Sequence, residues 1–222
     1  MANNISSKIA DNAQLYVNNI KTLSVIITDR ANEYLQKVDK QDSEPFVVAI
    51  DGPCASGKST LADQLIEDLP VNYNLNCSLI RADHFFLPPD LRTEERLSEP
   101  GGNIHRERFL EEVAAQIKSG ETFSYGHFDC RTMSLSESII VKPAPIIIVE
   151  GAYSHHPLWR SQIIGLTVFC EADLELRVDR IRNRNGEEGL RNFLNKWIPL
   201  ENKYFTAYNI RQSSDIIYRF EG

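Results

Sequence analysis

The spacing of hydrophobic and polar residues changes along the chain and predicts alternating strands and helices. Short apolar, β-branched runs predict five buried strands, at 45–50, 76–81, 144–149, 166–170 and 215–220. Between them, apolar residues three or four apart predict helices over 59–69, 106–119, 174–184 and 187–208. Pro199 should break or kink the last of these. The alternation predicts an α/β fold with a mainly parallel five-stranded sheet and helices on both faces.

The N-terminal segment has a helical pattern of its own. One face repeats from about residue 11 to residue 40, through Tyr16, Ile20, Leu23, Ile27, Ala31, Tyr34 and Val38. We expect this amphipathic helix to pack on the main core, and a contact in a homo-oligomer is the alternative. The polar stretch 40–44 then joins an N-terminal helical extension, 1–44, to a main domain, 45–222.

Two other segments follow neither spacing. Residues 87–102 form a stretch rich in proline, glycine and charge, and long ordered loops in compact domains are usually functional. Residues 123–141 are polar with short apolar pieces, which predicts a small hairpin.

Composition limits the class of protein. The chain has 222 residues, of which 42% are hydrophobic, enough for one sizeable core. Its formal net charge of −7 argues against nucleic acid or an anionic membrane as the main partner. No apolar run approaches the roughly 20 residues that a membrane span needs, and the polar N-terminus lacks a signal-peptide core. Four widely spaced cysteines predict reduced thiols and a cytoplasmic location.

A glycine-rich motif lies between the first predicted strand and the helix that follows it. Residues 52–60 fit the pattern G-x-x-x-x-G-K-[ST], whose backbone N–H groups wrap phosphates at a helix N-terminus. Lys58 would reach the β- and γ-phosphates of ATP, and the Ser59 hydroxyl would bind Mg²⁺. The candidate nucleotide-binding residues are Gly52, Pro53, Cys54, Ala55, Ser56, Gly57, Lys58, Ser59 and Thr60.

Acidic residues end two further predicted strands. Ligands in parallel α/β sheets bind beyond the carboxyl ends of the strands, where Asp83 and Glu150 lie. Mg²⁺ takes oxygen ligands and keeps several waters, so Ser59 and one or two carboxylates suffice. Glu150 is therefore a candidate metal residue. Asp83 has two open roles, binding the metal through water or accepting the proton of an attacking hydroxyl.

An arginine-rich helix is the third chemical feature. Arg180 and Arg184 are four residues apart and share one helix face. They could stabilise charge on a phosphoryl group in transfer, and a solvated basic face is the alternative. Gly186 offers a hinge at which a lid could begin.

In this order the motifs resemble the uridine kinase/phosphoribulokinase family of P-loop kinases. The residues that carry the resemblance are 52–60, 83–86, Tyr125, 146–151 and 180–184, and it runs from about Phe46 to Tyr218. It implies the three-layer P-loop NTPase fold and transfer of the ATP γ-phosphate to a sugar hydroxyl, such as that of uridine or cytidine. It also implies Asp83 as the base, Ser59, Asp83 and Glu150 around magnesium, and Tyr125 against the nucleobase.

The chain also departs from that family. The acidic residue that holds the ribose hydroxyls is absent, and Asn103 or His105 stands in the corresponding stretch. The pyrimidine-binding histidine is not evident, so His127 or Arg131 is a candidate, with Phe85 as a further wall of a base-sized pocket. The acceptor therefore stays open among a nucleoside, a ribulose phosphate, pantothenate and glycerate. A regulator that binds nucleotide and signals through the N-terminal helix is the other alternative.

Overall fold

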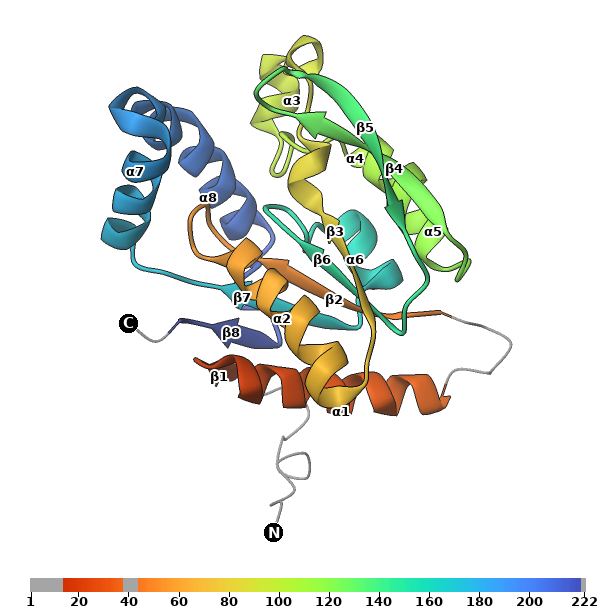
Figure 1. The fold of residues 1–222 in the computed structure, drawn as a ribbon. Coiled ribbons are helices and arrows are strands. Elements are labelled where there is room, and N and C mark those ends of the chain that lie inside the picture. Colours follow the sequence, from red (N-terminus) through yellow and green to blue (C-terminus); the bar gives the residue numbers. More distant parts are fainter. Residues whose placement is uncertain (1–13, 38–43, 221–222) are drawn as a thin grey trace.

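A six-stranded, fully parallel sheet forms the centre of the computed structural model, which describes residues 14–37 and 44–220 (Figure 1). The strand order is β1-β8-β7-β2-β6-β3. The strands are β1 (Leu15–Val17), β2 (Phe46–Asp51), β3 (Cys77–Arg81), β6 (Ile146–Glu150), β7 (Leu166–Cys170) and β8 (Ile216–Tyr218). The α/β class and all five expected strands are confirmed.

The expected number of strands was one too few. Tyr16, expected on the N-terminal helix, lies in β1, which pairs in parallel with β8. The backbone N–H of Leu15 donates to the carbonyl of Asp215 at 2.9 Å, so tertiary pairing overrides the weak helical pattern there. The residues expected in that helix at 11–13 and 38–40 lie outside the described ranges.

Helices cover both faces of the sheet (Figure 1). Helices α1 (Ile20–Lys37) and α2 (Lys58–Tyr73) pack on one face, where Leu23 and Ile27 of α1 share a core with Leu61 and Leu65 of α2. The hydrophobic stripe of the N-terminal helix thus packs on the main core. The division into an extension, 1–44, and a domain, 45–222, stays a prediction.

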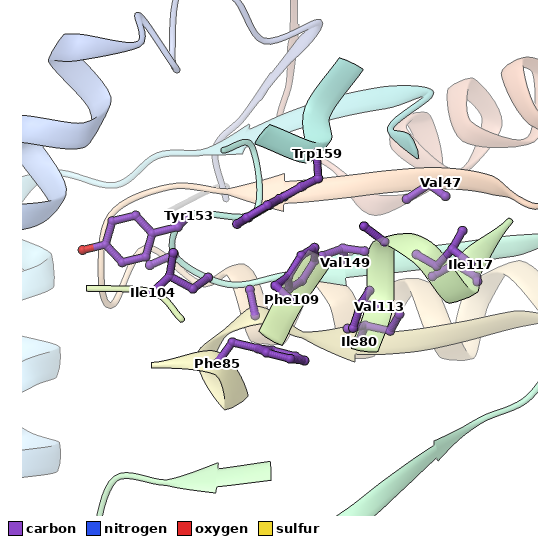
Figure 2. Close-up of a cluster of buried hydrophobic side chains, with 14 of the residues drawn as sticks. Val47, Ile80, Phe85, Ile104, Phe109, Val113, Ile117, Val149, Tyr153 and Trp159 are labelled. Carbon is purple, nitrogen blue, oxygen red and sulfur yellow. The ribbon is translucent and has the colours of Figure 1, made fainter. Parts of the chain in front are cut away.

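The other face carries the helical segment 106–117 and α6 (Pro157–Ile163). The segment 106–117 is helical throughout, as α4 (Arg106–Phe109), a π-helical turn at 110–114 and α5 (Ala115–Ile117). Figure 2 shows Phe109, Val113 and Ile117 of this segment among the buried side chains of that core, together with Trp159. Trp159 belongs to α6, a short helix that the sequence pattern did not predict.

The C-terminal helices follow the predicted course with one difference. Helix α7 (Leu174–Asn192) is interrupted at Gly186, whose φ of +70° and ψ of −179° are not helical. A π-helical turn at 193–197 leads into α8 (Ile198–Ala207). The backbone at Trp197 and Ile198 is right-handed helical, so the helix runs on through Pro199, and the hydrogen bonding changes to the π-helical pattern just before the proline.

The two irregular segments lie at the same end of the sheet. The expected hairpin is confirmed, as β4 (Phe123–Asp129) and β5 (Ser134–Val141), which pair antiparallel. The segment 87–102 holds a 3₁₀ turn at Pro89–Leu91 and the short helix α3 (Glu94–Ser98). In Figure 1, α3 and the hairpin stand on one side above the strand ends, and α7 and α8 stand on the other.

Candidate active site

The register of the sheet brings the chemistry-bearing strand ends together. Glu150 pairs with Ile50 of β2 on one side and with Arg81 of β3 on the other. Asp83 follows in the 3₁₀ turn after β3, and its Oδ1 accepts a hydrogen bond from the Ala152 backbone N–H at 3.1 Å. The carboxyl ends of β2, β6 and β3 therefore form one edge, as parallel strands require.

The phosphate-loop motif, 52–60, connects β2 to α2. Gly52 has φ +144°, and a Cβ there would lie 2.1 Å from the Cys170 carbonyl oxygen, so only glycine fits. Its backbone N–H donates to Asp51 Oδ1 at 2.7 Å. Asp51 is fully buried, and its other oxygen accepts from the His155 N–H at 3.0 Å and the Tyr204 hydroxyl at 2.8 Å. This network fixes where the loop leaves the strand.

Helices α7 and α8 hold the loop from its far side. Arg177 Nε donates to the Cys54 carbonyl at 2.8 Å, and Arg180 donates to the Ala55 carbonyl at 3.0 Å. Glu201 Oε2 accepts from the Cys54 N–H at 2.9 Å. Arg177 and Glu201 are both buried, so these are low-dielectric, charge-assisted contacts.

Lys58 is buried and charged. Its Nζ donates to the carbonyls of Gly52 and Pro53 at 2.8 and 3.1 Å, so it folds back on its own loop. Burial by itself lowers the pKa of Lys58, but the nearby carboxylates, Glu201 and Asp83 foremost, outweigh it and leave the pKa raised. The ammonium group is therefore available to a bound phosphate at neutral pH.

The proposed metal residues meet in the structure. Ser59 Oγ lies 3.3 Å from Glu150 Oε2, while Glu150 Oε1 is paired with Arg81 at 2.6 Å. Burial and the neighbouring Asp83 raise the pKa of Glu150. Within 14–37 and 44–220, no three His, Cys, Asp or Glu side chains gather into a metal cage. The hydroxyl and carboxylate oxygens instead fit Mg²⁺, which keeps waters and shares its ligands with phosphates.

Asp83 has the surroundings expected of a base for a hydroxyl. Desolvation, opposed by Lys58, raises the pKa of its carboxyl. Gly151, with φ +131°, lets the carboxylate approach the end of β6, because a Cβ there would lie 2.7 Å from Asp83 Oδ1.

Lys58, Ser59 and Asp83 face one cavity of about 890 Å³, large enough for a nucleotide and a small acceptor, and Glu150 is not among its lining residues. Lys58, Ser59, Thr60 and Asp83 line its floor, and Arg180 and Arg184 line the α7 side. The other lining residues are Cys54, Ala55, Gly57, Phe86, Arg92, Asn103, Cys130, Arg131, Met133, Ala152, Tyr153, Asn185, Phe193, Trp197, Glu201 and Phe220.

Of the six residues proposed to bind the acceptor besides Asp83, the structure brings two to the cavity. Asn103 and Arg131 line it. Phe85, His105, Tyr125 and His127 are not among its lining residues.

Packing explains where those four residues lie. Phe85 is fully buried against Phe109, with ring centroids 5.1 Å apart, and its neighbour Phe86 faces the cavity in its place. Tyr125 is buried beside Phe85, and its hydroxyl lies 3.2 Å from His84 Nδ1. His127 stacks on His84 at 3.9 Å.

His105 lies 3.2 Å from Glu107, at the start of α4. The residues that the sequence reasoning missed include Asp51, Glu201 and Trp197. Only Glu201 carried a signal, because it is the one charged residue in the stretch from 197 to 202.

Comparisons with known proteins point to one kind of enzyme. No protein-family model matches the chain. It is 25% identical over 183 residues to uridine kinase-like protein 4 of Arabidopsis thaliana, covering 78% of this chain and 36% of that protein. It is 27% identical over 184 residues to a pantothenate kinase of Listeria monocytogenes, covering 74% of this chain and 59% of that protein. The chain thus spans about a third to three fifths of these relatives.

Solved structures agree on the fold. A possible uridine kinase from Bacillus stearothermophilus superimposes with a TM-score of 0.63 at 18% identity, over 87% of this chain and 99% of that one. At this identity the superposition supports the three-layer fold, and the sequence matches supply the kinase relationship. Together with the assembled phosphate loop, these comparisons support a likeness to P-loop kinases of the uridine kinase/phosphoribulokinase type.

Proposed function

We propose that the protein is an ATP- and Mg²⁺-dependent kinase that transfers the γ-phosphate to a hydroxyl of a small molecule, in the cytoplasm. The observation that carries the proposal is the single cavity onto which Lys58, Ser59 and Asp83 open, with Glu150 behind Ser59. The named kinases among the relatives support the reaction class. No described helix is long and apolar enough to cross a membrane.

Each residue has a role that its surroundings support. The loop N–H groups and Lys58 would bind the phosphates, and Ser59 with Glu150 would hold Mg²⁺, which neutralises phosphate charge when bound. Asp83 would orient the acceptor hydroxyl and take its proton. Arg180 and Arg184, on the cavity wall, would bind the oxygens of the transferred group.

The acceptor is a nucleoside such as uridine or cytidine, a related sugar or polyol, or a small hydroxy acid such as pantothenate or glycerate. The absence of a carboxylate at 103–105 weakens the case for a ribose diol, and Asn103 occupies that part of the cavity wall. The pantothenate kinase relative supports the hydroxy acid as a real alternative.

A coupled ADP-release screen over nucleosides, sugars, polyols and hydroxy acids, with mass detection of the phosphorylated product, tests the proposal. Asp83→Asn should lower kcat by about 10²- to 10⁴-fold on any accepted substrate, while ATP still binds in calorimetry. Asp90→Asn, an exposed carboxylate outside the cavity lining, is the matched control and should keep full turnover.

Two results would contradict this. If Asp83→Asn kept near-normal turnover, Asp83 would not be the base. If phosphate were released with no phosphorylated product across the panel, the alternative of a nucleotide-hydrolysing regulator would be favoured.

A further inference from the structure

The charge on the cavity wall bears on which acceptor the site takes. Three arginines, Arg81, Arg92 and Arg106, lie near Asp83 or in the segment that follows it. Arg81 pairs with Glu150 at 2.6 Å and Asp63 at 2.7 Å, and Arg106 pairs with Glu99 at 2.5 Å. Their charges are therefore neutralised by the protein. Of the three, Arg92 alone lines the cavity.

Arg92 has no carboxylate partner. No Asp or Glu of the described part of the chain lies within ion-pair distance of its guanidinium. Burial lowers the pKa of Arg92, the Cys130 thiol only partly opposes this, and no carboxylate does. A partly buried cation without a counterion is unfavourable unless a ligand supplies the opposite charge.

The guanidinium is nevertheless held in place. Its Nε donates to the Leu87 carbonyl at 2.6 Å, and its Cζ lies over the Trp197 ring, 5.5 Å from the centroid. Trp197 comes from the π-helical turn before α8, and it lines the same cavity. The hydrogen bond uses Nε, and within the described ranges the two terminal amino groups have no hydrogen-bond acceptor. Those groups form the fork that binds carboxylate or phosphate oxygens.

The neighbouring wall is neutral and polar. Asn103 is 5% exposed and lines the cavity, and its Oδ1 has no hydrogen-bond partner among the described residues. Asn103 also interacts with the Tyr153 hydroxyl, a second lining group. A buried amide oxygen without a donor should accept from a hydroxyl or an N–H of the ligand.

The lining carboxylates are Asp83 and Glu201, and Glu201 is engaged by the Cys54 N–H. After Asp83, no further free carboxylate among the lining residues could grip the two hydroxyls of a ribose. The site is thus better suited to a ligand with one reacting hydroxyl and a negative charge.

We propose that the acceptor is an anion-bearing hydroxy compound, whose hydroxyl meets Asp83 and whose carboxylate or phosphate binds the terminal amino groups of Arg92. This inference rests on the proposed kinase function and narrows it. It places a hydroxy acid or a sugar phosphate above a neutral nucleoside. Arg92 is then the specificity-determining residue of the site, and Asn103 provides an additional contact.

Matched substrate pairs test the proposal with the full-length protein. In each pair one member carries the anionic group and the other lacks it: a hydroxy acid and its primary amide, and a sugar phosphate and the free sugar, with uridine and cytidine alongside. We expect the anionic member of one pair to have the higher kcat/KM. The pair that shows the preference tells whether the bound anion is carboxylate or phosphate.

Arg92→Gln should lower kcat/KM for the anionic acceptor by about 10- to 100-fold, chiefly through KM, because a charge-assisted hydrogen bond is lost. It should leave the neutral member and the KM for ATP unchanged, so the preference within the pair disappears. Arg92→Lys should retain part of this preference, because the positive charge remains although the two terminal amino groups of the guanidinium are lost. Arg191→Gln, an exposed arginine of α7 outside the cavity lining, should behave as the wild type.

The outcomes separate the two proposals. An equal loss on both members of the pair would mean that Arg92 acts only through its packing on Trp197, and would overturn the inference. Efficient phosphorylation of neutral nucleosides alone would overturn the inference and leave the kinase function standing. If the wild type phosphorylated no compound of the panel, the kinase function and the inference would both be wrong.

Discussion

Replacing Gly151 by alanine should impair phosphoryl transfer without touching a charged residue. Gly151 ends the Val-Glu-Gly element and has φ +131°, a region that side chains rarely enter. An added Cβ would lie 2.7 Å from Asp83 Oδ1 and 3.0 Å from the Asp83 backbone nitrogen. The substitution therefore acts directly on the position of the proposed base.

The size of the effect follows from these distances. An ordinary contact begins at 3.4 Å, so the carboxylate must shift by about 0.7 Å, the difference between 3.4 and 2.7 Å. Because a misplacement of about 1 Å can cost about 10²-fold in rate, we expect kcat to fall about 10- to 100-fold. The forced backbone conformation should also cost about 1–3 kcal/mol of the free energy of unfolding.

Steady-state kinetics on the accepted substrate, calorimetric ATP binding and thermal unfolding measure the three quantities. ATP affinity should stay near the wild-type value, since the phosphate loop is not displaced. Gly120→Ala is the matched control, because Gly120 has φ +66° but lies outside the cavity lining. It should lose stability and keep turnover. If Gly151→Ala lost stability and also kept full turnover, the position of Asp83 would not limit the reaction.

Two further predictions concern other buried groups. Burial, with Glu201 nearby, raises the pKa of Cys54 to about 11, so iodoacetamide should modify Cys54 slowly at pH 7. Bound ATP should slow the modification further. Equal rates with and without ATP would mean that the nucleotide does not cover this thiol. Burial lowers the pKa of His156 from 6.5 to about 4, so the unfolded chain binds this proton more tightly and stability is lost as the pH falls below 6.5. The free energy of unfolding should drop by about 2 kcal/mol from this group between pH 7 and pH 5. His156→Asn, which can still cap α6, should reduce that drop in denaturant titrations, and an unchanged pH dependence would refute the assignment.

The strand ends and the phosphate loop could be predicted from the sequence because each is a local pattern. An apolar run that stops at Glu150, and the two glycines at 52 and 57 ahead of Lys58, can each be recognised within a few residues. The strand β1 could not be predicted in this way. Its three residues lie among polar neighbours and pair with β8, about 200 positions later. Only tertiary pairing makes that segment a strand.

The cavity residues proposed to bind the acceptor were harder to predict, because their positions depend on which way adjacent side chains point. Phe85 and Phe86 are neighbours of the same type, yet one packs in the core and the other faces the cavity. Likewise, the sequence offers Arg81, Arg92 and Arg106 as equal cations. Arg81 pairs with Glu150 and Arg106 pairs with Glu99, so of the three only Arg92 has no carboxylate partner and lines the cavity.

The attachment of the phosphate loop to α7 and α8 has a consequence for engineering the protein. Arg177 and Glu201 hold the backbone of Cys54 from positions more than 120 residues downstream. A chimaera that takes 52–60 from one homologue and the C-terminal helices from another would therefore join a phosphate loop to helices whose side chains do not match its backbone. Nucleotide affinity should be inherited only when both segments are exchanged as a unit.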